Sequence, residues 1–216
     1  MVITIGGGYG SGGKYIALKL AELLNYTLCD DEIVSEAVAN SNVDMTDETF
    51  RFFDESQGSA PLTELTRLSS IQKSSYIGVV SSLSLDVTPM DQNMSDVQKE
   101  VLTGFADKGN CILLGRCADH YLKGRSDVLS IFVIDNEENC TKRIMEHFPA
   151  LSEKEAKKLI KKTDKRRADY YAFFTKKTWG DMKNYGLILN CEALGGADNA
   201  ADIVAAAVRA KEASVY

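Results

Sequence analysis

The sequence has little of what metal-binding or disulfide-stabilised proteins use. Its 216 residues include only two histidines, His120 and His147, so a histidine-rich metal site is not expected. The five cysteines are odd in number and include no C-x-x-C pair. This pattern argues against a disulfide framework or a zinc site and favours a reducing compartment. We therefore expect no metal site built from protein side chains.

Long apolar runs and an excess of positive charge are also missing. The longest strongly apolar stretch, VLSIFVI at residues 128–134, is far too short to cross a bilayer. The N-terminus lacks the basic and apolar regions of a signal peptide. A net charge of −6 disfavours a generic binder of nucleic acid or of a membrane surface. These features predict a cytoplasmic protein with no nucleic-acid or membrane partner.

Short apolar runs alternate with segments of helical periodicity along the chain. Strands are predicted at 2–5, 26–29, 111–115, 129–134 and 187–190. Strands that alternate with helices are typical of parallel βαβ units. We predict an α/β fold in a single domain over residues 1–216, with a five-stranded parallel sheet and helices on both faces.

The stretch GGGYGSGGK at residues 6–14 fits two nucleotide-binding motifs. Gly8 to Gly13 matches G-x-G-x-x-G, and Asp30 or Asp31 follows the second predicted strand where a ribose-binding acid belongs in a dinucleotide site. The same residues with the final lysine match the first seven positions of the phosphate-binding P-loop, G-x-x-x-x-G-K-[ST]. Both motifs direct backbone N–H groups and a helix N-terminus at phosphate, so the loop alone leaves the choice open.

Two residues after the glycines bear on that choice in opposite directions. Lys14 favours the P-loop, because this position supplies the ammonium group for the β- and γ-phosphates. Tyr15 occupies the next position, where a small Ser or Thr hydroxyl usually holds Mg²⁺. A phenol is a poor substitute for that ligand.

Basic residues later in the chain favour phosphate chemistry. Arg116 follows the third predicted strand at its carboxyl end, the edge at which open parallel sheets bind ligands. Ser152 and Glu155 form a capping box that opens a basic helix, and the segment from Asp164 to Arg167 places three cations beside one acid. Phosphoryl transfer needs fixed cations around the transferred group, whereas a dehydrogenase does not.

Taken together, these parts resemble the cytidylate kinase-like family of P-loop kinases, relatives of the nucleoside monophosphate kinases. The matching segments are YGSGGK at 9–14, YTLCDDEI at 26–33, LLGRCADH at 113–120, VIDNEENCTKRI at 133–144, TDKRRADYY at 163–171 and NYGLILNCEALG at 184–195. The resemblance implies a P-loop NTPase fold with a helical lid. It also implies transfer of the γ-phosphoryl group of ATP, with Mg²⁺, to a small acceptor, for which a nucleoside monophosphate such as CMP is favoured.

The resemblance further implies roles for single residues. The donor's phosphates would be held by Gly8, Gly10, Ser11, Gly12, Gly13, Lys14 and Tyr15. The catalytic residues would be Lys14, Arg116, Asp164 and Arg167. The acceptor would be bound by Asp30, Arg116, Arg143 and Lys162. The segment at about 41–91 would cover the acceptor base, and the segment at about 152–177 would form a basic lid.

The sequence also departs from the family pattern. Besides Tyr15, no plain Walker B motif, in which a strand leads into a magnesium-binding aspartate, is evident, so Mg²⁺ would be held mainly by ATP oxygens and water. The departures leave open a non-catalytic, nucleotide-binding regulatory protein and a kinase for a different small metabolite. A dinucleotide-binding oxidoreductase is the less favoured alternative. A homodimer also stays open, and the alanine-rich C-terminal helix could belong either to the core or to an interface.

Overall fold

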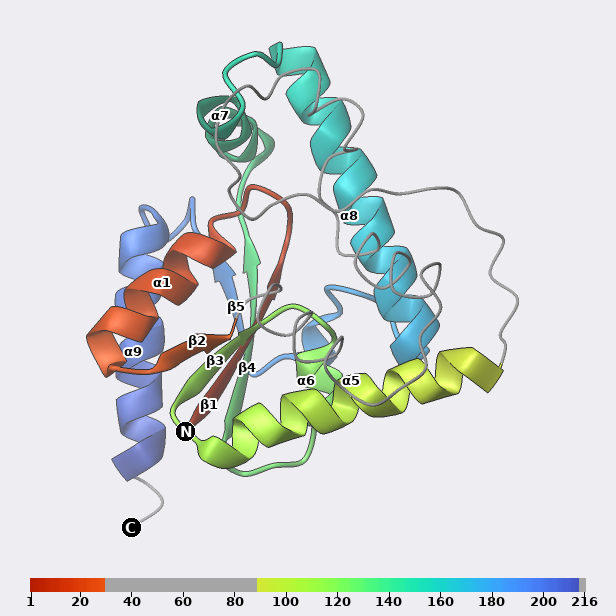
Figure 1. Cartoon of the computed structure of the whole chain (residues 1–216). Coiled ribbons are helices and arrows are strands. Elements are labelled where there is room, and N and C mark those ends of the chain that lie inside the picture. Colours follow the sequence, from red (N-terminus) through yellow and green to blue (C-terminus); the bar gives the residue numbers. More distant parts are fainter. Residues whose placement is uncertain (30–88, 214–216) are drawn as a thin grey trace.

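The computed structural model describes residues 1–29 and 89–213, and its strands form one parallel sheet (Figure 1). The sheet has five strands in the order β2-β3-β1-β4-β5. They are β1 (Val2–Gly7), β2 (Thr27–Cys29), β3 (Cys111–Leu114), β4 (Val128–Ile134) and β5 (Leu187–Asn190). The predicted five-stranded parallel sheet is confirmed, because apolar and β-branched runs of this length suit strands that are covered on both faces.

The central strand β1 brings three loops together at one edge of the sheet. Ile3 pairs with Ile112 of β3 on one side and with Leu129 of β4 on the other. Beyond the paired segment, the amide of Gly115 donates to the carbonyl of Ile5 at 2.9 Å. The loops that follow β1, β3 and β4 therefore leave the sheet side by side at its carboxyl edge, where open parallel sheets bind ligands.

Helices cover both faces of the sheet, as predicted (Figure 1). On one face lie α1 (Gly13–Leu24) and α9 (Ala197–Ala213), and on the other α5 (Pro89–Lys108), α6 (Ala118–Tyr121) and α8 (Glu153–Thr175). The helix α7 (Glu137–His147) packs against α8 beyond the carboxyl edge, and η1 (Met182–Asn184) is one short turn before β5. Within 1–29 and 89–213, no helix combines the length and apolar character needed to span a membrane.

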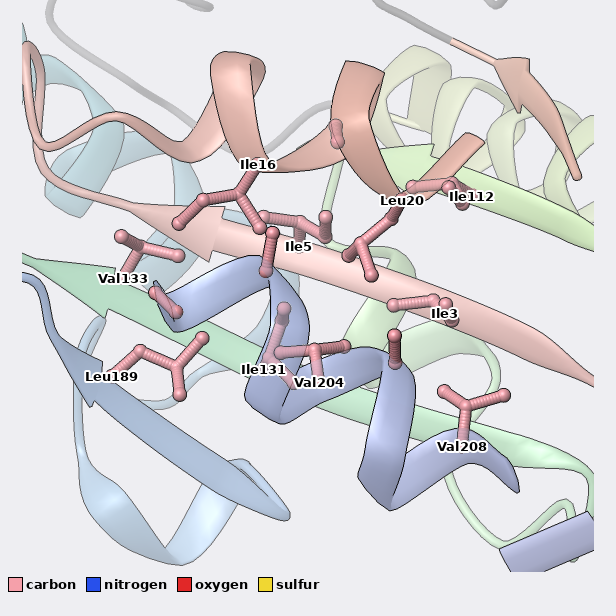
Figure 2. Close-up of a cluster of buried hydrophobic side chains, with 14 of the residues drawn as sticks. Ile3, Ile5, Ile16, Leu20, Ile112, Ile131, Val133, Leu189, Val204 and Val208 are labelled. Atoms are coloured by element: carbon pink, nitrogen blue, oxygen red, sulfur yellow. The ribbon is translucent and has the colours of Figure 1, made fainter. Parts of the chain in front are cut away.

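Alternation along β1 divides the core between the two faces. Ile3 and Ile5 point toward α1 and α9, where they pack with Ile16 and Val204 among others (Figure 2). Val2, one position away, packs instead in the cluster formed with α5 and α6. Successive strand residues face opposite sides, so Thr4 shares the face of Val2 rather than that of the isoleucines.

Local signals explain where several of these elements begin. Helix α8 starts with the predicted capping box, in which the Ser152 amide donates to the Glu155 carboxylate at 2.8 Å and the Ser152 hydroxyl accepts from the Glu155 amide. The five cysteines are all buried, and none of them forms a disulfide. Asp30, Asp31 and the acceptor-covering segment up to residue 88 lie outside the described residues, and α5 already begins at Pro89.

Candidate functional site

The glycine-rich loop joins β1 to α1 and fits closely against α7. Gly10 has φ of +79° and Gly12 has φ of +97°, a backbone region that glycine enters without strain. A Cβ atom added at Gly10 would lie 2.8 Å from the carbonyl oxygen of Cys140 in α7. Glycine is therefore required at this position by both conformation and space, and the loop leads directly into the N-terminus of α1, where an anion is stabilised.

Four cations from four parts of the chain line the cleft above this loop. The cleft has a volume of about 310 Å³ and includes residues 6–15. Lys14 comes from α1, Arg116 from the loop after β3, Arg143 from α7 and Arg167 from α8. Fixed positive charges beside a helix N-terminus make an anion site even in a chain of net negative charge. We call this part of the cleft the cationic end.

Arg116 is held in a strained and almost fully buried position. Its exposed fraction is 2%, and its φ is +57°. Its carbonyl oxygen accepts a hydrogen bond from Gln98 of α5, whose own side-chain oxygen accepts from the Tyr170 hydroxyl at 2.7 Å. Burial raises the pKa of Tyr170, which keeps its phenol protonated as a donor. Helices α5 and α8 thus fix the backbone of Arg116 through one hydrogen-bonded chain.

Gln98 was not among the residues predicted from the sequence, although a signal was present. Gln98 is fully buried and stands beside Val97 and one turn before Leu102, both of which are also buried. A glutamine on the apolar side of an amphipathic helix needs a buried hydrogen-bond partner. Its partner is the backbone carbonyl of Arg116, which comes close only when the chain folds. The sequence therefore indicated that Gln98 needs a partner but not which one.

The predicted catalytic pair on α8 contacts the backbone of the glycine loop. Asp164 accepts a hydrogen bond from the amide of Tyr9 at 2.7 Å. Arg167 donates to the carbonyl of Gly7 at 2.9 Å, and its guanidinium lies 5.4 Å from the centre of the Tyr9 ring. Burial raises the pKa of Asp164, while the Tyr9 amide and Arg167 oppose that rise. Lys162, by contrast, is exposed and is not among the residues that line the cleft.

Arg143 also contacts the loop, and a buried carboxylate holds it. The Arg143 guanidinium donates to the carbonyl of Gly10 at 2.8 Å and forms an ion pair with Asp135 at 2.7 Å. The Asp135 side chain has no exposed surface and also accepts from the side-chain amide of Asn139 at 3.0 Å. Burial alone would raise the pKa of Asp135, but the bonds from Asn139 and Arg143 outweigh it and lower the pKa.

An aspartate follows one of the central strands directly. No plain Walker B motif was evident from the sequence, but Asp135 comes immediately after β4, the strand next to β1. The signal was the apolar run VLSIFVI followed by Asp. The carboxylate is paired with Arg143, so its observed contact is with the side chain that supports the loop.

We predict that Asp135→Ala destabilises the protein by about 1–3 kcal/mol, because it removes a buried charged partner and leaves Arg143 without its carboxylate. Chemical denaturation at neutral pH measures the change. Folding lowers the pKa of Asp135, so its contribution is present above about pH 4 and declines as the pH falls below that value. The difference between wild type and variant should shrink accordingly in acid.

Asp107→Ala is the matched control. Asp107 pairs with Arg125 at 2.5 Å but is 63% exposed, and Arg125 keeps a second carboxylate, Asp127. Such a surface pair contributes less than about 1 kcal/mol. Equal losses of stability in the two variants would contradict the supporting role assigned to Asp135.

The residues of the loop suit phosphate groups better than they suit a metal ion. The Ser11 hydroxyl is buried and has no hydrogen-bond partner within the described chain, as expected where a ligand supplies one. The Tyr15 side chain is 50% exposed, and its hydroxyl donates to Asp198 of α9 at 2.9 Å. No group of three metal-ligating side chains occurs among residues 1–29 and 89–213.

The other end of the cleft is aromatic and carries one acid. Tyr171, Trp179 and Tyr185 line it together with Asp119, which accepts a hydrogen bond from the Tyr171 hydroxyl at 2.6 Å. Burial raises the pKa of Asp119, and the bond from Tyr171 opposes this effect. We call this part of the cleft the aromatic end. None of its residues was assigned a role from sequence, although LLGRCADH contains the acid three positions after Arg116.

Comparison with known proteins places the whole arrangement in a family. The model of the cytidylate kinase-like family matches residues 2–193. The crystal structure of an uncharacterized protein from Eubacterium ventriosum ATCC 27560 is similar, with 23% identity, a TM-score of 0.69 and coverage of 97% of this chain and 98% of that one. This likeness shows the fold.

Two shikimate kinases are more distant structural relatives. The enzyme from Bacteroides thetaiotaomicron has 13% identity and a TM-score of 0.45, with coverage of 88% of this chain and 86% of that one. The enzyme from Acinetobacter baumannii has 13% identity and a TM-score of 0.47, with coverage of 94% and 89%. No curated protein matches the sequence. The family match extends over most of the chain and includes the glycine loop and all four cations of the cleft, so the chain belongs to the cytidylate kinase-like family and has the fold of a P-loop kinase.

Proposed function

We propose that the protein is a phosphotransferase that moves the γ-phosphoryl group of ATP to a small acceptor, and that a nucleoside monophosphate such as CMP is the favoured acceptor. The observation that carries the proposal is the convergence of Lys14, Arg116, Arg143 and Arg167 on one glycine-rich loop at a helix N-terminus. Charge that spreads over a transferred phosphoryl group is stabilised by fixed cations of this kind.

In this proposal each part of the cationic end has a separate task. The loop amides and Lys14 bind the phosphates of ATP, and Arg116 binds the acceptor's phosphate. Arg167 stabilises the charge that develops on the transferred group. Asp164 positions the loop through the Tyr9 amide. Mg²⁺ bound to ATP neutralises the phosphate oxygens. Catalysis then consists of positioning and charge neutralisation, with no covalent step on the protein.

The proposal is tested by measuring ADP release from ATP in a coupled assay. The panel contains the nucleoside monophosphates and small hydroxyl- or phosphate-bearing acceptors, with Mg²⁺ present. We expect release well above the ATP-only blank with one acceptor, and CMP is the first candidate. If the protein binds ATP but releases no ADP above the blank with any acceptor, the proposed activity is rejected.

A non-catalytic, nucleotide-binding regulatory protein is the second candidate. The observation that favours it is the Tyr15 hydroxyl, which donates to Asp198 and not toward the loop. This candidate predicts ATP binding without turnover. A dinucleotide-binding oxidoreductase would instead show quenching of Trp179 fluorescence by NADH, and the cluster of cations has no task in that chemistry.

Three wider features complete the proposal. The chain forms one domain, with a segment at about 41–91 that covers the acceptor and a basic lid at about 152–177, within which α8 lies. It works in the cytoplasm on small-molecule nucleotides, without a nucleic-acid partner. A homodimer is the oligomer that size-exclusion chromatography would reveal, and the alanine-rich side of α9 packs in the core of the chain itself.

A further inference from the structure

The residues that line the cleft carry charges of both signs. Lys14 lies at the loop, Arg143 and Arg167 donate to the loop backbone, and Arg116 lines the same cleft, whereas Asp119 is the one carboxylate among the lining residues of the described chain. Tyr171 donates to that carboxylate at 2.6 Å, and the rings of Tyr185 and Trp179 both pack on Phe132, with ring centres 4.8 and 5.2 Å away. A phosphate is attracted to the cations and repelled by the Asp119 carboxylate. The aromatic end therefore suits an uncharged part of a ligand.

A buried hydroxyl lies on the sheet side of the same cleft. Thr4 lines the cleft, is only 2% exposed, and its Oγ1 has no hydrogen-bond partner within the described residues. Alternation along β1 puts Thr4 on the face of Gly6, where an added Cβ would lie 3.2 Å from the Phe132 ring and 3.7 Å from the Tyr185 ring. The threonine hydroxyl and the aromatic end thus belong to one face of the sheet.

An unpartnered buried hydroxyl costs free energy, and a ligand that bonds to it removes that cost. The Thr4 hydroxyl offers both a donor and an acceptor, and the Asp119 carboxylate has acceptor sites beyond the one that Tyr171 uses. An alcohol group can accept from the first and donate to the second. A phosphate is repelled by the charge of Asp119, a carboxylate has no proton to donate to it, and a hydrocarbon satisfies neither residue.

We propose that Thr4, Asp119, Tyr171 and Tyr185 form a recess that binds the hydroxyl-bearing, uncharged part of the acceptor, which orients its phosphate toward Arg116. This inference rests on the proposed function, and it adds that the acceptor is a phosphate ester with free hydroxyl groups. Its hydroxyl groups belong either to the sugar of a nucleotide or to a phosphorylated polyol.

Thr4→Val tests the recess, with Thr163→Val as the matched control. Both residues carry a buried hydroxyl without a partner in the described chain, but Thr163 lies on α8 and is not among the cleft residues. Valine has nearly the same shape, so both variants should be at least as stable as wild type. Thermal denaturation checks this, and any binding defect of Thr4→Val is then local.

Isothermal titration calorimetry compares CMP, glycerol 3-phosphate and inorganic phosphate as ligands. We expect CMP or glycerol 3-phosphate to bind more tightly than inorganic phosphate, and whichever of them does so identifies the source of the hydroxyl groups. We call the ratio of the Kd of inorganic phosphate to the Kd of the organic phosphate the advantage. It should fall about five- to tenfold in Thr4→Val and also fall in Asp119→Asn. Inorganic phosphate should bind equally to wild type and Thr4→Val, and Thr163→Val should behave as wild type with every ligand.

Two results would overturn the recess. One is that neither organic phosphate binds more tightly than inorganic phosphate. The other is that the advantage persists in both Thr4→Val and Asp119→Asn. Because the titration needs no turnover, it is separate from the proposed activity. The protein could bind the organic phosphate more tightly than inorganic phosphate and yet release no ADP with any acceptor. That result would reject the phosphotransferase activity and support the recess.

Discussion

Replacing Lys14 by alanine is expected to lower phosphoryl transfer by about 100- to 1,000-fold and to leave the fold intact. Lys14 stands in the first turn of α1 and lines the cleft, where its ammonium group would meet the β- and γ-phosphates. Alanine is the best helix former, so α1 should be retained. The measurement is kcat in the ADP-release assay, with circular dichroism and thermal denaturation as checks on the fold.

Lys19→Ala is the control for Lys14→Ala. Lys19 lies on the same helix, but its ammonium group pairs with Asp198 at 2.7 Å and the residue does not line the cleft. Removing it should leave kcat unchanged. A wild-type rate in Lys14→Ala would reject the assignment of the loop as a P-loop, whatever the acceptor is.

Gly10→Ala is expected to destabilise the protein by about 2–4 kcal/mol and to abolish ATP binding. The new Cβ would meet three atoms of α7: the carbonyl oxygen of Cys140 at 2.8 Å, its Cα at 3.2 Å and Cγ1 of Ile144 at 3.2 Å. Two of these belong to the backbone and cannot rotate away. The loop must shift, and with it the carbonyl that accepts from Arg143. Chemical denaturation and ATP calorimetry measure the two effects.

Gly8→Ala separates a steric cause from a general effect of losing a glycine. A Cβ at Gly8 would lie 3.7 Å from the nearest atom, the Asp164 carboxylate, which is an ordinary contact, and Gly8 is not among the residues with positive φ. The free energy of unfolding of Gly8→Ala should stay within about 1 kcal/mol of the wild-type value. If Gly10→Ala proved as stable as Gly8→Ala, the close packing of the loop on α7 would not hold in solution.

The elements that could be predicted from sequence are those set by neighbours in the chain. The strands followed from short apolar runs, the start of α8 from Ser152 and Glu155, and the loop from its glycines. Each of these signals lies within a few residues. The cations of the site were also found, because Arg116 and Arg167 stand at positions that the family resemblance marks.

What could not be predicted depends on residues far apart in the chain. Arg167 donates to Gly7 across 160 positions, and Tyr170 reaches Gln98 across 72. Spacing shows that Asp135 follows a strand, but only the fold shows that its carboxylate pairs with an arginine. The buried hydroxyl of Thr4 likewise could not be interpreted from sequence. Only the fold places the rings of Phe132 and Tyr185 on the same face of the sheet.

The contacts of the glycine loop also bear on the order in which the protein is made. The loop is synthesised well before the groups that hold its backbone, because Arg143, Asp164 and Arg167 follow their partners in the loop by 133 to 160 residues. During translation the loop therefore lacks part of its native support until residue 167 has left the ribosome. An N-terminal fragment containing the complete glycine motif would lack these contacts, so competence to bind a nucleotide should arise late and together with the second half of the sheet.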